Sequence, residues 1–245
     1  MIARIVAPET LDGLAEDDPD ARRSRRDLRR IHRAMGTRSL LLRRWRSLLP
    51  PGERAGPLRV LELGAGDGTL LLGVARSLAP DGTAVELTLL DRQDLLSRQV
   101  IEEYRKAGWI AAPEVVDVEA WAAAGAAGPG ARESRPWDLI VANLFLHHFE
   151  GPRLAGLLRA VASRTDRFLA LEPRRGLLAL VASHLVGAIG ANAVTRRDSV
   201  LSVRAGFRGQ ELSALWPADH GPWRLQEGAA GPFSHAFAAR SAVAP

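Results

Sequence analysis

The chain has 245 residues, of which 47% are hydrophobic and 25% are charged, and its formal net charge is +5. This length and balance are those of one large globular domain, or of a domain with an appended segment. The chain contains no cysteine, which excludes disulfides, thiolate metal sites and cysteine nucleophiles. Lys106 is the only lysine, so nearly all of the basic charge is arginine.

The most apolar stretch covers residues 177–189, contains His184 and is too short to cross a bilayer. The first 18 residues carry several carboxylates where a secretory signal would need basic and then apolar residues. We therefore expect no membrane span and a cytoplasmic location.

Residues 1–50 are expected to be helical. Asp18-Pro19 begins a basic helix, with aspartate as the N-cap, and Gly36 ends it. One apolar stripe runs along this helix at Leu28, Ile31 and Met35, and is expected to pack on the rest of the protein. A second helix over residues 40–49 is closed by Pro50-Pro51-Gly52. We expect residues 1–52 to form a helical lid over the substrate, and residues 53–245 to form the main domain.

From residue 58 onward, short apolar runs alternate with helical patterns. Strands are expected at residues 58–63, 84–90, 114–118, 137–142 and 167–171. Helices are expected between them at residues 69–78, 92–107 and 152–163, with a surface loop over 122–135. Strands separated by helices of this length indicate crossover connections, and hence a parallel sheet with helices on both faces.

The end of the chain breaks this alternation. After a helix at residues 209–215, strands at 223–227 and 234–240 are joined by a glycine-rich connection. A short connection of this kind predicts an antiparallel hairpin at one edge of the sheet. The predicted fold class is therefore α/β, a Rossmann-like, mostly parallel sheet of seven strands with a C-terminal antiparallel hairpin.

A glycine loop follows the first expected strand, in the pattern Glu62-x-Gly64-x-Gly66-x-Gly68. Glycines let the backbone approach a ligand closely, because no Cβ is in the way. The third glycine stands one position too early for the dinucleotide fingerprint, and no lysine is placed for a Walker A loop. Glu62 would repel a pyrophosphate but suits a ligand with an ammonium and a sulfonium. Asp91, at the end of the second strand, can accept hydrogen bonds from both hydroxyls of a ribose.

This set resembles the S-adenosylmethionine (SAM) signature of class I, Rossmann-like methyltransferases of the small-molecule type. Residues 115–118, 137–144 and 169–173 resemble later segments of that family in order, so the resemblance covers roughly residues 58–240. Taken alone, the glycine loop could be a structural turn and Asp91 a solvated strand end. The resemblance implies that SAM is the cofactor, S-adenosylhomocysteine (SAH) the product, and the binding residues Glu62, Gly64, Ala65, Gly66, Gly68, Asp91, Arg92, Asp117, Val118, Asn143 and Leu144.

Three histidines are candidates for the base that deprotonates an acceptor. His147 and His148 follow the fourth strand, a position that faces the methyl end of the cofactor in the resembled class. His32 lies on the N-terminal basic helix. The structural alternative is that Leu-His-His-Phe anchors a helix and that His32 is a packing residue. Adjacent histidines are not expected to face one site on a strand or helix. No metal site is expected, because no carboxylate stands beside them at ligand spacing.

The segment after the fourth strand, residues 143–146, lacks the Asn/Asp-Pro-Pro-aromatic pattern of many amine-methylating enzymes. Residues 8–31 resemble, more loosely, methyltransferases of aromatic polyketide metabolism. The resemblance implies O-methylation of a small phenolic or enolic metabolite. The alternatives are C-methylation of a quinone precursor and a SAM-binding module without catalysis. Residues 172–175 and 195–199 are expected to shape the acceptor site.

The arginines of residues 22–33 are expected to be solvated, because the apolar stripe of their helix faces the protein and only Trp45 is near enough for base stacking. We therefore expect a small-molecule substrate and no nucleic-acid partner. The sequence leaves the oligomeric state open, with a homodimer as one alternative.

Overall fold

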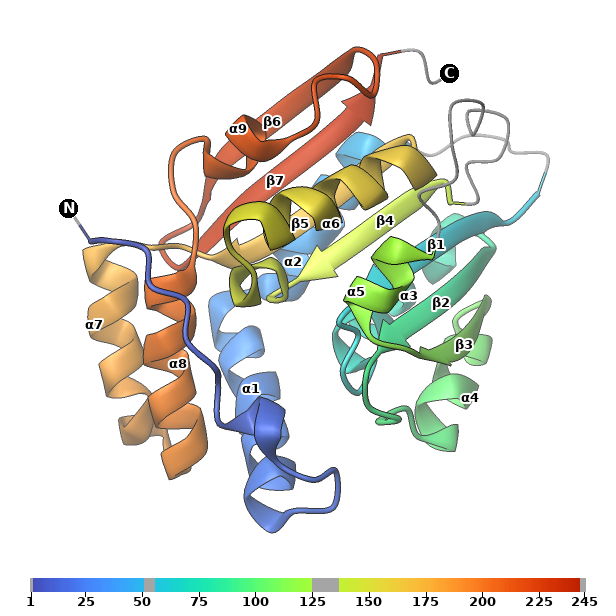
Figure 1. The fold of residues 1–245 in the computed structure, drawn as a ribbon. Coiled ribbons are helices and arrows are strands. Elements are labelled where there is room, and N and C mark those ends of the chain that lie inside the picture. The colour runs from blue at the N-terminus through green and yellow to red at the C-terminus, as the bar shows by residue number, and fades with distance from the viewer. Residues whose placement is uncertain (1, 51–55, 125–136, 243–245) are drawn as a thin grey trace.

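The computed structural model describes residues 2–50, 56–124 and 137–242. Its centre is a seven-stranded sheet in the order β3-β2-β1-β4-β5-β7-β6 (Figure 1). Strand β7 runs antiparallel to its neighbours β5 and β6, and the pairs formed by β1 to β5 are parallel. The strands are β1 (Leu58–Leu63), β2 (Val85–Asp91), β3 (Trp109–Val115), β4 (Leu139–Asn143), β5 (Arg167–Pro173), β6 (Trp223–Ala230) and β7 (Ser234–Ser241). The predicted fold class is confirmed.

Helices cover both faces of the sheet, since parallel strands must bury both of their faces. One face packs against α2 (Thr37–Leu48), α3 (Thr69–Leu78) and α4 (Arg98–Lys106). The other packs against α5 (Val118–Ala123), α6 (Gly151–Arg164) and α9 (Glu211–Leu215). Side chains of β1 alternate between the layers, with Val60 in the first and Leu61 in the second.

Three further helices lie beyond the carboxyl ends of the strands, side by side in Figure 1: α1 (Pro19–Met35), α8 (Ala193–Ala205) and α7 (Leu177–Leu185). Helix α1 begins at Asp18, whose side chain accepts hydrogen bonds from two backbone N–H groups of the first turn, and ends at Gly36. Helices α7 and α8 were not expected from the sequence.

The buried face of α1 is not the expected stripe of Leu28, Ile31 and Met35, which are only partly buried. The fully buried residues are instead Ala21, Ser24 and Asp27. The Ser24 hydroxyl is 2.8 Å from that of Thr195, and the Asn192 N–H donates to Asp27 at 2.8 Å. Hydrogen bonds to α8 therefore decide which face of α1 turns inward. The arginines of α1 are exposed as expected, except Arg25, which is half-buried and donates hydrogen bonds to Glu16 and Gln93.

Several element boundaries differ from the prediction. The third strand covers Trp109–Val115, because Asp117 caps α5 and turns the chain out of the sheet. Helix α4 begins at Arg98 behind the N-cap Ser97, so residues 92–97 are free to contact the N-terminus. Helix α2, grouped with the lid by sequence, packs in the core, where Trp45 stacks on Trp109. The boundary at residue 52 and most of the expected 122–135 loop lie outside the described residues.

Within the described residues, no helix is long and apolar enough to cross a membrane.

Candidate functional site

The glycine loop between β1 and α3 requires glycine for reasons visible in its geometry. Gly64, Gly66 and Gly68 all have positive φ angles, of 67°, 55° and 69°. A Cβ on Gly64 would lie 2.1 Å from a ring carbon of Phe145, whereas nothing lies within 4 Å of one on Gly66. The backbone at Gly66 is therefore open to close approach by a ligand.

The loop is fixed from behind by hydrogen bonds. The Ala65 N–H donates to the Leu90 carbonyl at 3.0 Å, tying the loop to β2. The buried Tyr104 hydroxyl donates to the Gly68 carbonyl at 2.7 Å. Tyr104 was not singled out in the sequence, because its place on α4 gives no sign of a contact 36 residues away.

Glu62 lies at the carboxyl end of β1 with 3% of its surface exposed, and its Oε2 atom has no hydrogen-bond partner in the described structure. Burial, together with the charges of Asp67 and Asp91, raises its pKa to about 8. The Asn143 Oδ1 atom, on the neighbouring strand β4, is also buried without a partner among the described residues. A ligand that brings N–H donors and positive charge would satisfy Asn143 and would favour the ionised form of Glu62.

Asp91 joins the end of β2 to the glycine loop. One carboxylate oxygen accepts from the Gly66 N–H at 2.8 Å, and the other from the Gln93 N–H at 3.0 Å. A carboxylate oxygen can accept two hydrogen bonds, so each retains capacity for a hydroxyl. Binding of a ribose by Asp91 stays a prediction.

Residues 2–16, which we call the N-terminal strap, cross the carboxyl edge of the sheet. At one end, the Asp198 carboxylate of α8 accepts from the backbone N–H groups of Thr10 and Leu11, at 2.9 and 2.8 Å. At the other, the Gln93 amide donates to the Leu14 carbonyl at 3.2 Å, and Glu16 accepts from the Asp94 N–H at 3.0 Å. The strap thus links α8 to the segment after β2.

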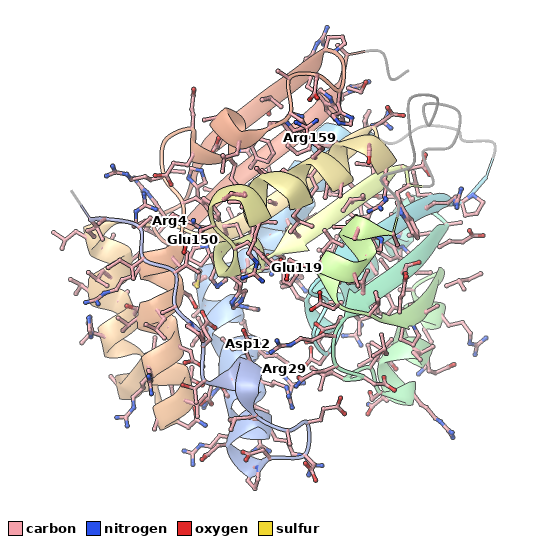
Figure 2. All side chains as sticks on the ribbon, in the orientation of Figure 1. Arg4, Asp12, Arg29, Glu119, Glu150 and Arg159 are labelled. Atoms are coloured by element: carbon pink, nitrogen blue, oxygen red, sulfur yellow. The ribbon has the colours of Figure 1, made fainter. Side chains whose placement is uncertain are left out.

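Helix α1 adds a second contact to the glycine loop, because Arg29 forms an ion pair with Asp67 at 3.1 Å. Figure 2 labels Asp12, on the strap, and Arg29, on α1. Arg92, a predicted cofactor residue, is exposed and donates a hydrogen bond to the Asp12 carbonyl; its contact with a cofactor stays a prediction. The strap and α1 therefore lie at this edge of the sheet, and their role as a lid over a substrate stays a prediction.

His147 is held between two carboxylates and is 3% exposed. Its Nδ1 atom is 2.8 Å from Glu172, and its Nε2 atom is 3.3 Å from Glu9 of the strap. Burial alone would lower its pKa, but hydrogen bonds with Glu172 and Glu9 raise the pKa to about 9. His147 is therefore a cation at neutral pH.

Glu172 also supports the turn after β4. It accepts hydrogen bonds from the backbone N–H groups of Phe145 at 3.1 Å and Leu146 at 2.9 Å. Leu144, just before them, has a φ of 50° and is the one non-glycine residue with a positive φ among the described residues. Such strain persists where the surroundings fix the backbone, typically at a functional site.

His148 has a different environment. Its side chain is 23% exposed, and its Nδ1 atom is 3.4 Å from an Asp12 carboxylate oxygen. Burial and the positive charge of His147 lower its pKa, so it is neutral at pH 7. The two adjacent rings are 4.2 Å apart, because the chain here is a 3-10 turn, Leu146–His148. The expectation that they face different sites is wrong.

The expectation that no carboxylate accompanies the histidines is also wrong. Glu9, His147 and His148 each place one ligand atom within 4.8 Å of the others, which is close enough to hold a metal ion. Glu9 was missed because it lies 138 positions from His147 in the sequence, with no local pattern to connect them. A proton on His147 offsets one of the two negative charges of Glu9 and Glu172. A metal ion could bind His147 only after this proton had left.

The remaining candidates are spread along the edge. Burial lowers the pKa of His32 to about 4, although the negative charge of Asp67 acts to raise it. The Nε2 atom of His32 has no partner among the described residues. Asp117 is exposed and caps α5 by accepting from the Glu119 N–H at 2.8 Å, while Val118 packs in the core. Their contacts with a cofactor stay predictions.

No protein-family model and no curated protein sequence matches the chain. Among solved structures, the plantazolicin methyltransferase BpumL in complex with SAH is similar, with a TM-score of 0.59 and 15% identity over 92% of this chain and 91% of that one. The DszA carbon methyltransferase is similar with a TM-score of 0.53 and 15% identity, over 84% of this chain and 54% of that one. At these identities the likeness establishes the architecture, and the chain therefore has the Rossmann-like fold of SAM-dependent methyltransferases.

Proposed function

We propose that the chain is a SAM-dependent methyltransferase whose acceptor is the oxygen of a small phenolic or enolic molecule of the polyketide type. The observation that carries this proposal is Glu62, a buried carboxyl group at the carboxyl edge of a methyltransferase fold, with one oxygen that has no partner among the described residues. Burial keeps a proton on Glu62 in the chain alone, and a cationic ligand beside it would favour the charged carboxylate. SAM brings two positive groups, whereas a dinucleotide or ATP would bring phosphates.

The residues around the glycine loop have the charge and hydrogen-bonding groups that SAM would need. Glu62 and the open backbone at Gly66 would face its cationic amino-acid end, and Asp91 its ribose. The other predicted contacts are Gly64, Ala65, Gly68, Arg92, Asp117, Val118, Asn143 and Leu144. When bound, SAM supplies a methyl group on a sulfonium, which is already activated. The chain's own task is then to align the acceptor, exclude water and remove the acceptor's proton.

His148 is the best-suited base of the three histidines. It is neutral, partly exposed and oriented by Asp12 at its Nδ1 atom. With a proton on Nδ1, the Nε2 atom can accept the proton of an acceptor hydroxyl. His147, held as a cation by Glu9 and Glu172, would stabilise the resulting oxyanion. His32 is the second candidate for the base.

C-methylation is the second candidate reaction. The same base would create the enolate carbon nucleophile of a quinone precursor, and one of the similar folds is a carbon methyltransferase by its printed name. A module that binds SAM without transferring the methyl group is the third. These alternatives share the SAM site and differ in what happens to the methyl group.

Calorimetry tests the cofactor. SAM and SAH should bind the purified chain, and NAD and ATP should not; the reverse pattern would refute the proposal. Labelled SAM with a library of phenols and enols then tests transfer, and NMR of the product distinguishes O- from C-methylation. Binding of SAM without transfer to any acceptor, host extracts included, would identify a non-catalytic module.

Single substitutions test the base. His148→Gln should reduce the transfer rate by about 100-fold or more with little change in SAM affinity, as expected for loss of a general base. His184→Gln, at an exposed position on α7, is the matched control and should change neither quantity. If His32→Gln abolishes transfer and His148→Gln does not, the base lies on α1.

A further inference from the structure

Helix α7 presents an apolar stripe to solvent. Its exposed residues are Leu177 (73%), Leu178 (60%), Val181 (48%) and Leu185 (61%). At about 100° per residue these positions fall within roughly a third of the helix circumference. Ala179 and Ser183, on the opposite side, are buried, and α7 packs against α8. Ile189, in the 3-10 turn that follows, is also 53% exposed. We call Leu177, Leu178, Val181, Leu185 and Ile189 the apolar stripe.

The surroundings of the apolar stripe are basic. Residues 174–197 contain no aspartate or glutamate. Arg196 and Arg197 are exposed in the first turns of α8, and the Arg196 side chain lies against Gly187, beside the stripe. On the far side of α8, α1 exposes three further arginines, Arg22, Arg23 and Arg26, and one carboxylate near the start of α8, Asp20. An anionic surface would complement this part of the molecule.

We propose that the apolar stripe docks on the surface of a lipid bilayer that contains anionic phospholipids. Helix α7 would lie in the plane of the interface, with the aliphatic side chains among the acyl chains and the arginines at the headgroups. This inference is independent of the proposed methyl transfer. It is also compatible with the absence of a spanning helix among the described residues, since α7 has only 9 residues.

The composition of the apolar stripe favours a bilayer over a protein partner. Binding sites for proteins are usually anchored by tryptophan, tyrosine or arginine in central pockets, and every member of the stripe is aliphatic. A second copy of the chain is disfavoured by charge, because a symmetric contact would bring Arg196 and Arg197 of both copies together without an acidic residue between them.

Vesicle sedimentation with the full chain tests the proposal. The chain should bind vesicles of phosphatidylcholine mixed with phosphatidylglycerol. Its affinity for vesicles of phosphatidylcholine alone should be at least about tenfold lower. Added salt should weaken the binding, because it screens the arginines. Arg196→Gln with Arg197→Gln should reduce the preference for the anionic lipid and leave residual binding.

The double variant Leu178→Asp, Leu185→Asp should lose at least about tenfold in partitioning to the anionic vesicles. It removes two exposed aliphatic side chains that would enter the bilayer, and it adds two negative charges to a face that meets anionic lipid. Ile110→Asp is the matched control, because Ile110 is 70% exposed and lies on the edge strand β3. This variant should bind the vesicles as the wild type does. Calorimetry with SAM shows separately whether each variant retains its cofactor site.

Three outcomes would overturn the proposal. The first is that the wild-type chain does not bind the mixed vesicles at low salt. The second is that the aspartate double variant and Ile110→Asp bind equally. The third is a wild-type dimer in sedimentation velocity that the double variant abolishes, which would show that a second copy covers the stripe. If the double variant does not fold, Leu177→Ser with Leu178→Ser and the lipid dependence of the wild type still decide the question.

Discussion

The glycine loop offers a sharp test of the site geometry, through the pair of variants Gly64→Ala and Gly66→Ala. Both residues have left-handed backbone angles, so alanine costs about 1–2 kcal/mol at either position. Alanine also reduces the conformational entropy of the unfolded chain, which stabilises the fold by about 0.4–1 kcal/mol. Gly66→Ala, with nothing within 4 Å of the new Cβ, should therefore destabilise the fold by about 1 kcal/mol.

Gly64→Ala has an added cost, because its Cβ would lie 2.1 Å from the Phe145 ring. Overpacking of this kind adds about 1–3 kcal/mol, for a total of about 2–4 kcal/mol. Urea unfolding followed by tryptophan fluorescence measures both losses. Adding Phe145→Leu should relieve the clash, so that Gly64→Ala costs about 1 kcal/mol in that background. Equal losses for the two glycines, or no relief by Phe145→Leu, would refute the reasoning.

Three further predictions concern carboxylates. Between pH 4.5 and about 8, folded Glu62 holds a proton that the unfolded chain releases, so the free energy of unfolding should fall as pH rises. The total fall has an upper limit of about 5 kcal/mol (3.5 pH units at about 1.4 kcal/mol each), and Glu62→Gln should abolish it. Urea titrations that show the same pH dependence in both proteins would contradict the burial argument. Asp91→Asn should weaken SAM binding in calorimetry by about 1–3 kcal/mol, and unchanged affinity would place the ribose elsewhere. Asp198→Asn should weaken the contact between the strap and α8, so the Thr10 and Leu11 amides should exchange hydrogen faster while exchange in β1 stays unchanged. Slow exchange at both amides would show that other contacts hold the strap in place.

The parts of the fold that were predictable from sequence are those set by local pattern. The strand at 58–63 and the helix at 69–78 were predicted with the bounds that β1 and α3 have, because a buried run, a glycine turn and a helix follow one another directly. The third strand was misplaced, because Asp117 reads equally as a strand end or a helix cap. The inward face of α1 was wrong because Asp27 and Ser24 are satisfied by α8, 165 or more positions away.

The candidate site divides in the same way. The glycine loop and Asp91 come from contiguous motifs, and the structure brings them together through the Gly66–Asp91 hydrogen bond. The surroundings of His147 and His148 were not predictable, because Glu9 and Asp12 reach them from the N-terminal strap and Glu172 from β5. Only the tertiary fold makes one histidine a cation and keeps the other neutral.

The long reach of the N-terminal strap has a consequence for the order of folding. Its contacts with α8 join residues 188 and 201 positions apart, through Thr10 with Asp198 and Arg4 with Ala205. During synthesis, the strap leaves the ribosome well before α8, so this docking surface does not exist until α8 has emerged. Contacts of such high sequence separation also form slowly. A nascent chain would therefore form β1 to β5 while the carboxyl edge at Glu62 is still uncovered, and the strap could dock there only after α8 had emerged.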